Sequence, residues 1–126
     1  MTADPYSARV RALFASAAHA GRVGDGLEAY VEDQGVRVEL TARVENGTLG
    51  ELRFRAWGCP HLLAAAEAFC VEYEGREQSE LGAFQAVEVM QTLPVPREKM
   101  GRILVLEDAV RSLRACGRDQ PGQGKD

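Results

Sequence analysis

The chain has 126 residues and a formal net charge of -4 at pH 7, with 15 lysine and arginine residues against 19 aspartate and glutamate residues. This length suits one domain that buries a core without disulfide bonds. The acidic balance disfavours nucleic acid as a partner. No apolar run approaches the ~20 residues of a membrane span, and the N-terminus lacks a signal-peptide pattern. We therefore expect a cytoplasmic protein with no membrane contact.

The first third of the chain predicts one helix and a glycine-rich loop. Apolar residues recur at helical spacing over residues 6–18, after an Asp-Pro pair that suits a helix start. The four glycines between positions 20 and 35 predict a loop, with room for one short edge strand at residues 27–31. His19 lies beside this region, and we expect it to be a solvated surface histidine.

A β-hairpin is the clearest local pattern. Over residues 36–45, apolar side chains alternate with charged or polar ones, which is typical of a half-buried strand. Asn46 and Gly47 follow, and this pair favours a two-residue turn in which both central residues adopt positive φ. The alternation resumes over residues 51–56, which predicts the partner strand.

The second half predicts helices. Residues 60–73 form a helical pattern whose expected buried stripe is Leu62, Leu63, Ala66, Phe69, Cys70 and Tyr73. One or two short helices follow within residues 79–93 and stop at Pro94 and Pro96, and a last helix is predicted over residues 98–116. We therefore predict one domain over residues 1–116 of the α+β class, with a small antiparallel sheet of two or three strands packed against several helices. Residues 117–126 are expected to form a disordered tail.

The junction between the hairpin and the first of these helices carries Cys59. With Pro60 suited to the first helical position, Cys59 is expected at the N-cap, where the free N–H groups and the positive dipole end of a helix favour a thiolate. His61 could add a nitrogen ligand. The alternative is that Gly58, Cys59 and Pro60 form only a tight corner with a small buried thiol. The other two cysteines, Cys70 and Cys116, are interpreted as a core residue and an incidental thiol, and the three form no Cys-x-x-Cys pair.

Several strings resemble, in the same order along the chain, the NifU N-terminal or IscU-like family of iron-sulfur cluster assembly scaffolds. "PYSARVRALF" resembles the opening helix of that family, and "FRAWGCPHLLAAAE" is similar to its Gly-Cys corner followed by a helix of small residues. "LEDAVRSL" resembles its C-terminal helix. The similarity covers about residues 5–115 and implies the IscU/NifU-like fold.

The resemblance implies a protein that is not an enzyme. Such a scaffold receives iron and receives sulfur from a cysteine desulfurase, builds a [2Fe-2S] cluster on three cysteines with a nearby aspartate and histidine, and passes it on. Of the three cysteine ligands that the resemblance implies, only Cys59 is present in this chain. Gln34 stands near the first cysteine position and Val36 at the aspartate; Met100 or Arg102 takes the third cysteine position, and Gly101 that of the histidine.

Two functions remain as hypotheses. In the first, the protein is scaffold-like and binds iron, sulfur or a [2Fe-2S] cluster through Cys59, helped by His61 or by a second subunit in a homodimer. In the second, it is a degenerate scaffold that acts as a protein-interaction or regulatory module without a cluster. Its partners would be a cysteine desulfurase, a chaperone or an iron-sulfur client protein. The residues expected to contact them are Trp57, Leu93, Pro94, Val95, Pro96, Arg97 and Lys99.

Overall fold

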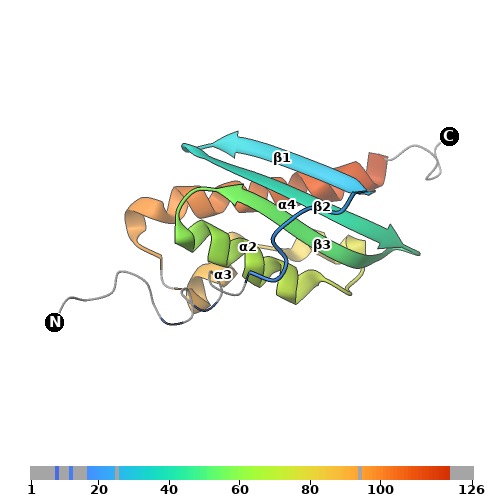
Figure 1. Cartoon of the computed structure of the whole chain (residues 1–126), viewed down its shortest axis with the longest axis horizontal. Helices are drawn as coiled ribbons and strands as arrows, with labels where there is room; N and C mark the ends of the chain where they lie inside the picture. The colour runs from blue at the N-terminus through green and yellow to red at the C-terminus, as the bar shows by residue number, and fades with distance from the viewer. Residues whose placement is uncertain (1–7, 9–11, 13–16, 25, 94, 120–126) are drawn as a thin grey trace.

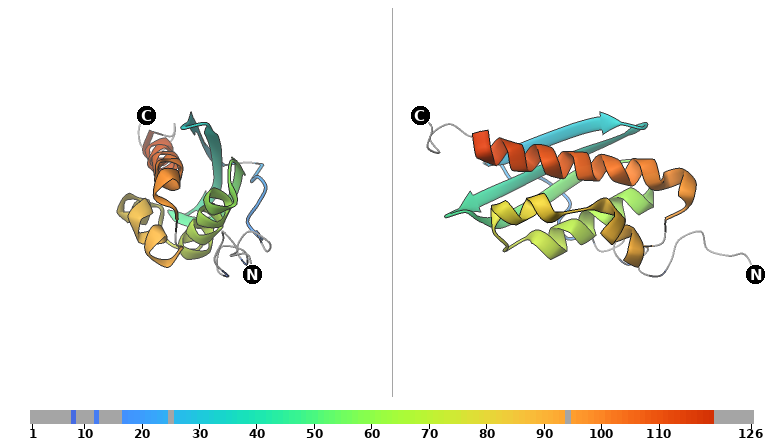
Figure 2. Two further views of the ribbon diagram at one scale, coloured as in Figure 1. Left: turned by 90° about the vertical axis from the view of Figure 1, so that its left-hand side faces the viewer. Right: turned by 180° about the vertical axis from the view of Figure 1, so that it is seen from behind.

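The computed structural model describes residues 8, 12, 17–24, 26–93 and 95–119, without the side chains of residues 92 and 116–119. A sheet forms one layer and the helices cover one of its faces (Figures 1 and 2). The elements are β1 (Leu27–Asp33), β2 (Val36–Glu45), β3 (Thr48–Trp57), α2 (Pro60–Tyr73), η1 (Gln78–Ala83), α3 (Ala86–Thr92), η2 (Arg97–Lys99) and α4 (Met100–Asp119). This arrangement confirms the predicted α+β class.

The sheet has three antiparallel strands in the order β1-β2-β3. The predicted hairpin is confirmed, because Asn46 and Gly47 join β2 to β3 with φ angles of 54° and 79°. A second two-residue turn, formed by Gln34 and Gly35 with φ angles of 52° and 76°, joins β1 to β2. The edge strand predicted over residues 27–31 is therefore longer than expected, since β1 continues to Asp33 and its pairing with β2 runs to the turn.

Residues 17–24 form a segment that we call the strap. Its backbone pairs with the free edge of β3, where Gly21 N–H donates to the Phe54 carbonyl over 2.8 Å and Phe54 N–H donates to the His19 carbonyl over 2.9 Å. The strap then crosses the outer face of the sheet, in front of β3 and β2, and leads to the start of β1 (Figure 1). The helix predicted over residues 6–18 falls almost entirely outside the described residues.

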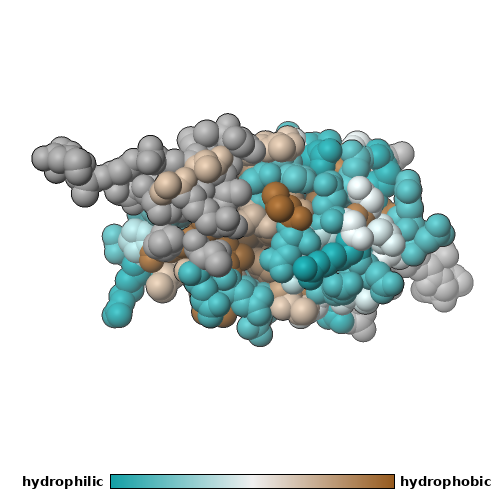
Figure 3. Space-filling view, turned by 90° about the horizontal axis from the view of Figure 1, so that it is seen from below, coloured by the Kyte–Doolittle hydropathy of each residue, from teal (hydrophilic) through white to brown (hydrophobic). Residues whose placement is uncertain are grey.

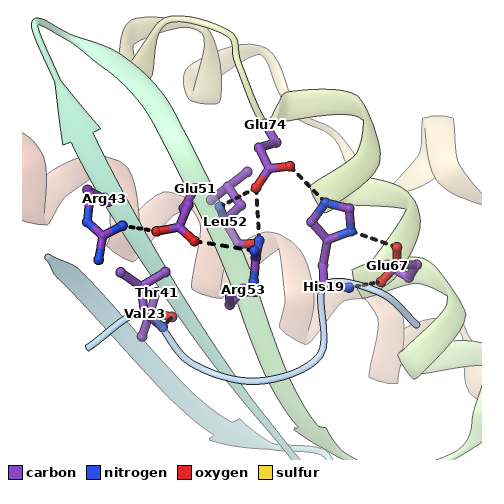
Figure 4. Close-up of polar contacts among 9 residues, drawn as sticks. All are labelled: His19, Val23, Thr41, Arg43, Glu51, Leu52, Arg53, Glu67 and Glu74. Carbon is purple, nitrogen blue, oxygen red and sulfur yellow. Dashed lines mark hydrogen bonds and ion pairs between the residues drawn. The ribbon is translucent and has the colours of Figure 1, made fainter. Parts of the chain in front are cut away.

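The strap corrects two expectations about the chain. Thr41 belongs to the polar phase of β2 but is fully buried, because Val23 N–H in the strap donates to its Oγ1 over 2.8 Å. His19 is not a solvated histidine, because its ring nitrogens lie within hydrogen-bond distance of two carboxylates, one on α2 and one at the C-cap of α2 (Figure 4). Neither contact is visible in the local sequence, since the partners lie far along the chain.

The core lies between the sheet and two helices. α4 packs mainly against β1 and β2, and α2 packs against β3; the views from the side and from behind show both helices on the same face of the sheet (Figure 2). Every residue of the predicted α2 stripe is buried except Leu63, which is partly buried. In α4, a row of apolar residues is also buried: Leu106, Ala109, Val110 and Leu113.

The remaining helices differ in their bounds from the prediction. The segment over residues 79–93 forms two short helices, η1 and α3. The last helix begins as one turn of 3-10 helix, η2, and α4 continues to Asp119. The tail boundary predicted after residue 116 therefore lies inside α4, and residues 120–126 are outside the described part of the chain.

The face seen from below in Figure 1 carries many hydrophilic side chains among its described residues (Figure 3). On the face seen from below in Figure 1, the strongly hydrophobic areas are small and separated by hydrophilic side chains (Figure 3). Exposed large apolar residues on the helices, such as Val71 and Val87, are single positions of the kind that most proteins carry. Within the described residues, no helix combines the length and the apolar composition needed to cross a membrane.

Candidate functional site

Cys59 lies at the corner where β3 ends and α2 begins. Its backbone is extended, with φ -87° and ψ 164°, and it occupies the N-cap position of α2 with Pro60 in the first turn, as predicted. The Cys59 carbonyl accepts hydrogen bonds from the Leu62 and Leu63 N–H groups, over 3.0 and 3.2 Å. The Cys59 side chain makes no capping hydrogen bond, so its sulfur does not cap the helix.

The corner is tight because Val36 packs against it. A Cβ atom added to Gly58 would lie 2.9 Å from Val36 Cγ1 and 2.8 Å from Leu62 Cδ2, closer than two carbon atoms normally approach. Gly58 is therefore required by space. The contact also places Val36 beside Cys59 in the fold, although 23 positions separate them in the sequence.

The two described thiols differ in accessibility. Cys59 keeps 9% of its surface exposed, whereas Cys70 is fully buried in the core. Burial raises the pKa of the Cys70 thiol well above its ordinary value, so this residue stays a protonated, inert thiol, as the sequence predicts. Cys59 is itself buried and belongs to the core cluster, as the alternative of a tight corner with a small buried thiol predicted. The side chain of Cys116 lies outside the described part of the structure.

His61 is less accessible than Cys59. The residue is 2% exposed. Burial lowers the pKa of His61, and the positive charge of Lys99 lowers it further, so the imidazole is neutral at neutral pH. A neutral imidazole can bind a metal ion, but side chains two residues apart at the start of a helix do not face each other. Closeness in the sequence therefore does not by itself bring Cys59 and His61 to one ion.

The β1–β2 turn and the start of α4 carry the other positions that the resemblance matches to cluster ligands, and these two segments meet. A Cβ atom added to Gly101, at the start of α4, would lie 3.4 Å from Oε1 of Gln34 in the β1–β2 turn. Asp33 is exposed, and its Oδ1 accepts the Gln34 N–H over 2.8 Å. The β1–β2 turn and the start of α4 thus meet, but glutamine and glycine occupy the meeting point.

This set of residues does not fit a [2Fe-2S] cluster held by one chain. Such clusters are bound mainly by cysteine thiolates, with histidine as the usual replacement. Among the residues that the structure describes, no group of three or more histidine, cysteine, aspartate or glutamate side chains could hold a metal ion. Of the cysteines whose side chains the structure describes, Cys59 and Cys70, only Cys59 stands at a position that the resemblance matches to a ligand.

Trp57 is exposed beside this corner, as the sequence suggested. It is 43% exposed on the outer face of the sheet. The guanidinium groups of Arg37, from the neighbouring strand, and Arg55 lie 5.3 and 5.8 Å from the centre of its ring. Exposed tryptophan with flanking arginine is a composition that protein interfaces favour.

The predicted partner-binding stretch after α3 is only partly exposed. Leu93 is buried in the core, so it cannot belong to an exposed binding surface. Val95 is half-buried and packs against the core, and Pro94 lies outside the described residues. Pro96 and Lys99 are half-buried, and Arg97 is exposed, as is Glu98, which was not predicted to contact a partner.

A cluster formed by His19, Glu67 and Glu74 was missed by the sequence analysis. Glu67 lies on α2, and Glu74, seven positions later, is the C-cap residue that follows the helix. A glutamate directly beside the predicted buried stripe, as Glu67 is beside Ala66, is a signal that a cation or hydrogen-bond donor must lie opposite it. The sequence carried that signal, but the donor, His19, comes from a distant segment.

Comparison with known proteins supports the fold. No protein-family model matches the sequence, and no curated protein sequence matches it. A nitrogen-fixing NifU-like protein (N-terminal part) from Brucella abortus superposes with a TM-score of 0.60 at 14% identity, over 86% of this chain and 94% of the other. A proposed iron-sulfur cluster assembly scaffold protein for the SUF system from Fervidobacterium islandicum gives a TM-score of 0.58 at 14% identity, over 84% and 82%. At these identities the likeness establishes architecture, and this chain therefore has the fold of NifU-like and SUF-system scaffold proteins.

Proposed function

We propose that this protein is a scaffold-like component of iron-sulfur cluster assembly in the cytoplasm, not an enzyme, in which Cys59 accepts sulfur or iron from a partner. The observation that carries the proposal is the position of Cys59. It stands at the N-cap of α2, in the fold of scaffold proteins, and the adjoining Gly58 packs against Val36 at the start of β2.

Sulfur is the cargo that a single thiol can take. The Cys59 thiolate attacks the outer sulfur of a persulfide on a donor such as a cysteine desulfurase. The sulfur-sulfur bond of the donor breaks, the electron pair leaves with the donor thiolate, and Cys59 becomes the persulfide, so that no further oxidant or reductant is needed. Cys59 lies at the N-terminal end of α2, where the positive end of the helix dipole and unpaired backbone N–H groups are found.

Assembly of a complete cluster would require ligands from outside the chain. The described residues offer Cys59 and, after a rearrangement that exposes it, His61. A second copy of the chain could supply the same pair across a homodimer, and an iron-sulfur client protein could supply its own cysteines. We therefore expect that the isolated monomer carries sulfur or iron without holding a stable [2Fe-2S] cluster.

The test compares sulfur uptake by matched cysteine variants. Wild type, Cys59→Ser, Cys70→Ala and Cys116→Ser are incubated anaerobically with a cysteine desulfurase and cysteine, and intact masses are measured. Wild type and the two control variants are expected to gain sulfur, and Cys59→Ser is expected to gain none. Equal sulfur uptake by Cys59→Ser and wild type would contradict the proposal.

The exposed Trp57 favours a second candidate function, an interaction or regulatory module that carries no cargo. Its side chain and the guanidinium groups of Arg37 and Arg55 form an aromatic and cationic surface beside Cys59. A Trp57→Ala variant should then lose about 2 kcal/mol or more of affinity for a desulfurase, chaperone or client protein, measured by calorimetry. Under this candidate Cys59→Ser would bind as wild type does and neither would carry sulfur, which separates the two functions.

A further inference from the structure

The His19 side chain bridges the carboxylates of Glu67 on α2 and of Glu74, the C-cap residue of α2. Its Nδ1 lies 2.7 Å from Oε2 of Glu67, and its Nε2 lies 2.9 Å from Oε1 of Glu74 (Figure 4). The His19 backbone N–H also donates to Oε1 of Glu67 over 2.9 Å. The His19 side chain is 15% exposed and that of Glu67 3%, so water competes weakly for these hydrogen bonds.

This geometry requires a protonated imidazole. An ionised carboxylate only accepts hydrogen bonds, and a neutral imidazole has a single N–H to donate, so both ring contacts of His19 are satisfied together only by the imidazolium ion. Partial burial of the ring lowers the pKa of His19, but the hydrogen bonds to Glu67 and Glu74 and the charges of these carboxylates outweigh it. The pKa of His19 therefore lies above its ordinary value of 6.5.

The surrounding charges make His19 the group that titrates near neutral pH. Glu74 also accepts hydrogen bonds from the Leu52 N–H and from the Arg53 guanidinium on β3, each over 2.9 Å. Burial raises the pKa of Glu74, but the hydrogen bonds that it accepts lower it by more, so Glu74 stays ionised. Cys70 faces the same carboxylates from α2, and the burial that raises the pKa of its thiol keeps it uncharged.

These contacts fasten one end of the strap. His19 is directly followed by the residues that pair with the edge of β3 at Phe54, and Val23 then covers Thr41 on the outer face of the sheet. The other charged side chain of the strap, Arg22, pairs with Glu28 and Glu39 on the sheet, at a distance from the His19 cluster. Attachment of the strap to α2 thus depends on the two ring contacts and the backbone contact of His19.

We propose that His19, Glu67 and Glu74 form a proton-operated clamp: protonated His19 holds residues 17–24 on β3, and neutral His19 releases them and uncovers the edge of β3 at Phe54. The neutral ring leaves one carboxylate facing a nitrogen lone pair, so one contact turns repulsive. Because the pKa of His19 is raised in the folded state, the stabilisation is complete below the ordinary value of 6.5 and is lost as the pH rises through the folded-state value. The clamp acts independently of Cys59 and of the function proposed for it.

Amide hydrogen exchange measured by NMR on the full chain tests the clamp. The probes are the Gly21, Val23 and Phe54 amides, whose hydrogen bonds attach the strap, and Leu40 in the central strand is the reference. After correction for the intrinsic pH dependence of exchange, protection of the three strap amides should fall through the titration of His19. The fall should be about tenfold for each unit by which the pKa of His19 differs between the clamped and released states. Unchanged protection, or an equal fall at Leu40, would overturn the proposal.

Two variants should respond in opposite directions. His19→Gln has no titratable ring, so its strap amides should be weakly protected at every pH. In Glu67→Gln, the carboxamide oxygen can accept the His19 backbone N–H while its NH2 group donates to the neutral ring, so protection should persist to high pH. His61→Gln removes the other of the two histidines in the chain and should keep the wild-type pH dependence. A pH-dependent step that survives in His19→Gln, or that disappears in His61→Gln, would assign the titration to another group and refute the clamp.

Discussion

Replacing Thr41 with valine tests how strongly the strap is attached to the sheet. Thr41 is fully buried and Val23 is 4% exposed, and the Val23 N–H donates to Thr41 Oγ1 over 2.8 Å. Valine has nearly the same shape as threonine but lacks the acceptor, so the Val23 N–H would be left buried without a hydrogen bond. Leaving a buried donor unsatisfied costs about 1–3 kcal/mol. We therefore expect Thr41→Val to lower the free energy of unfolding by about 2 kcal/mol, which shifts the ratio of folded to unfolded protein by a factor of about 30.

The assay is urea unfolding followed by circular dichroism and by Trp57 fluorescence. With a slope of about 2 kcal/mol per molar urea, the midpoint of Thr41→Val should fall by about 1 M while the slope stays unchanged. Thr41→Ser is the matched control: it keeps the oxygen and removes one methyl group, so it should lose only ~0.8 kcal/mol. If Thr41→Val proves as stable as Thr41→Ser or more so, the hydrogen bond to the strap does not stabilise the fold and the reasoning fails.

Three further predictions concern the core, a close backbone contact and the loss of stability at low pH. The ring of Phe69 lies 5.2 and 5.0 Å from two other aromatic rings, so Phe69→Ala should lower the free energy of unfolding by about 3–5 kcal/mol. A fall in the urea midpoint smaller than the fall caused by Thr41→Val would contradict this. Gly26→Ala places a Cβ atom 2.0 Å from the Ala42 carbonyl oxygen, so the start of β1 must move, at a cost of about 1–3 kcal/mol or more; an unchanged melting temperature would refute it. The pKa of Glu74 is lowered in the folded state, so its stabilisation is present above the ordinary value of 4.5 and is lost as the pH falls through the folded-state value. The stability difference between wild type and Glu74→Gln should therefore shrink over that interval, and urea midpoints whose difference stays constant with pH would contradict the assignment.

The local sequence predicted the elements that depend on local chemistry. Asn46 and Gly47 identify the hairpin because few other pairs adopt positive φ at both turn positions, and Pro60 identifies the start of α2 because proline fits the first turn of a helix. Cys59 at the N-cap follows from the same two facts. These signals need no knowledge of the rest of the fold.

Contacts between distant segments could not be predicted in the same way. His19 lies 48 and 55 positions before its two carboxylate partners, and Thr41 is buried by a segment that its alternation pattern does not include. Likewise, the pattern of β2 places Val36 in the core but does not reveal that it packs against the Gly58 corner. In each case tertiary packing decides the environment of the residue. The periodicity of its own strand or helix indicates only the face of that element on which the residue lies.

The acidic outer edge of the sheet has a consequence for association between copies of the chain. β1 pairs with β2 on one side and lies at the edge of the sheet order, and it ends in Glu32 and Asp33, both exposed. If two copies met through this edge, their carboxylates would approach each other, and like-charge repulsion would oppose the continuous strand pairing from which fibrils grow. The edge is thus protected against aggregation by its own charge, and the repulsion should weaken in acid, where carboxylates are neutralised.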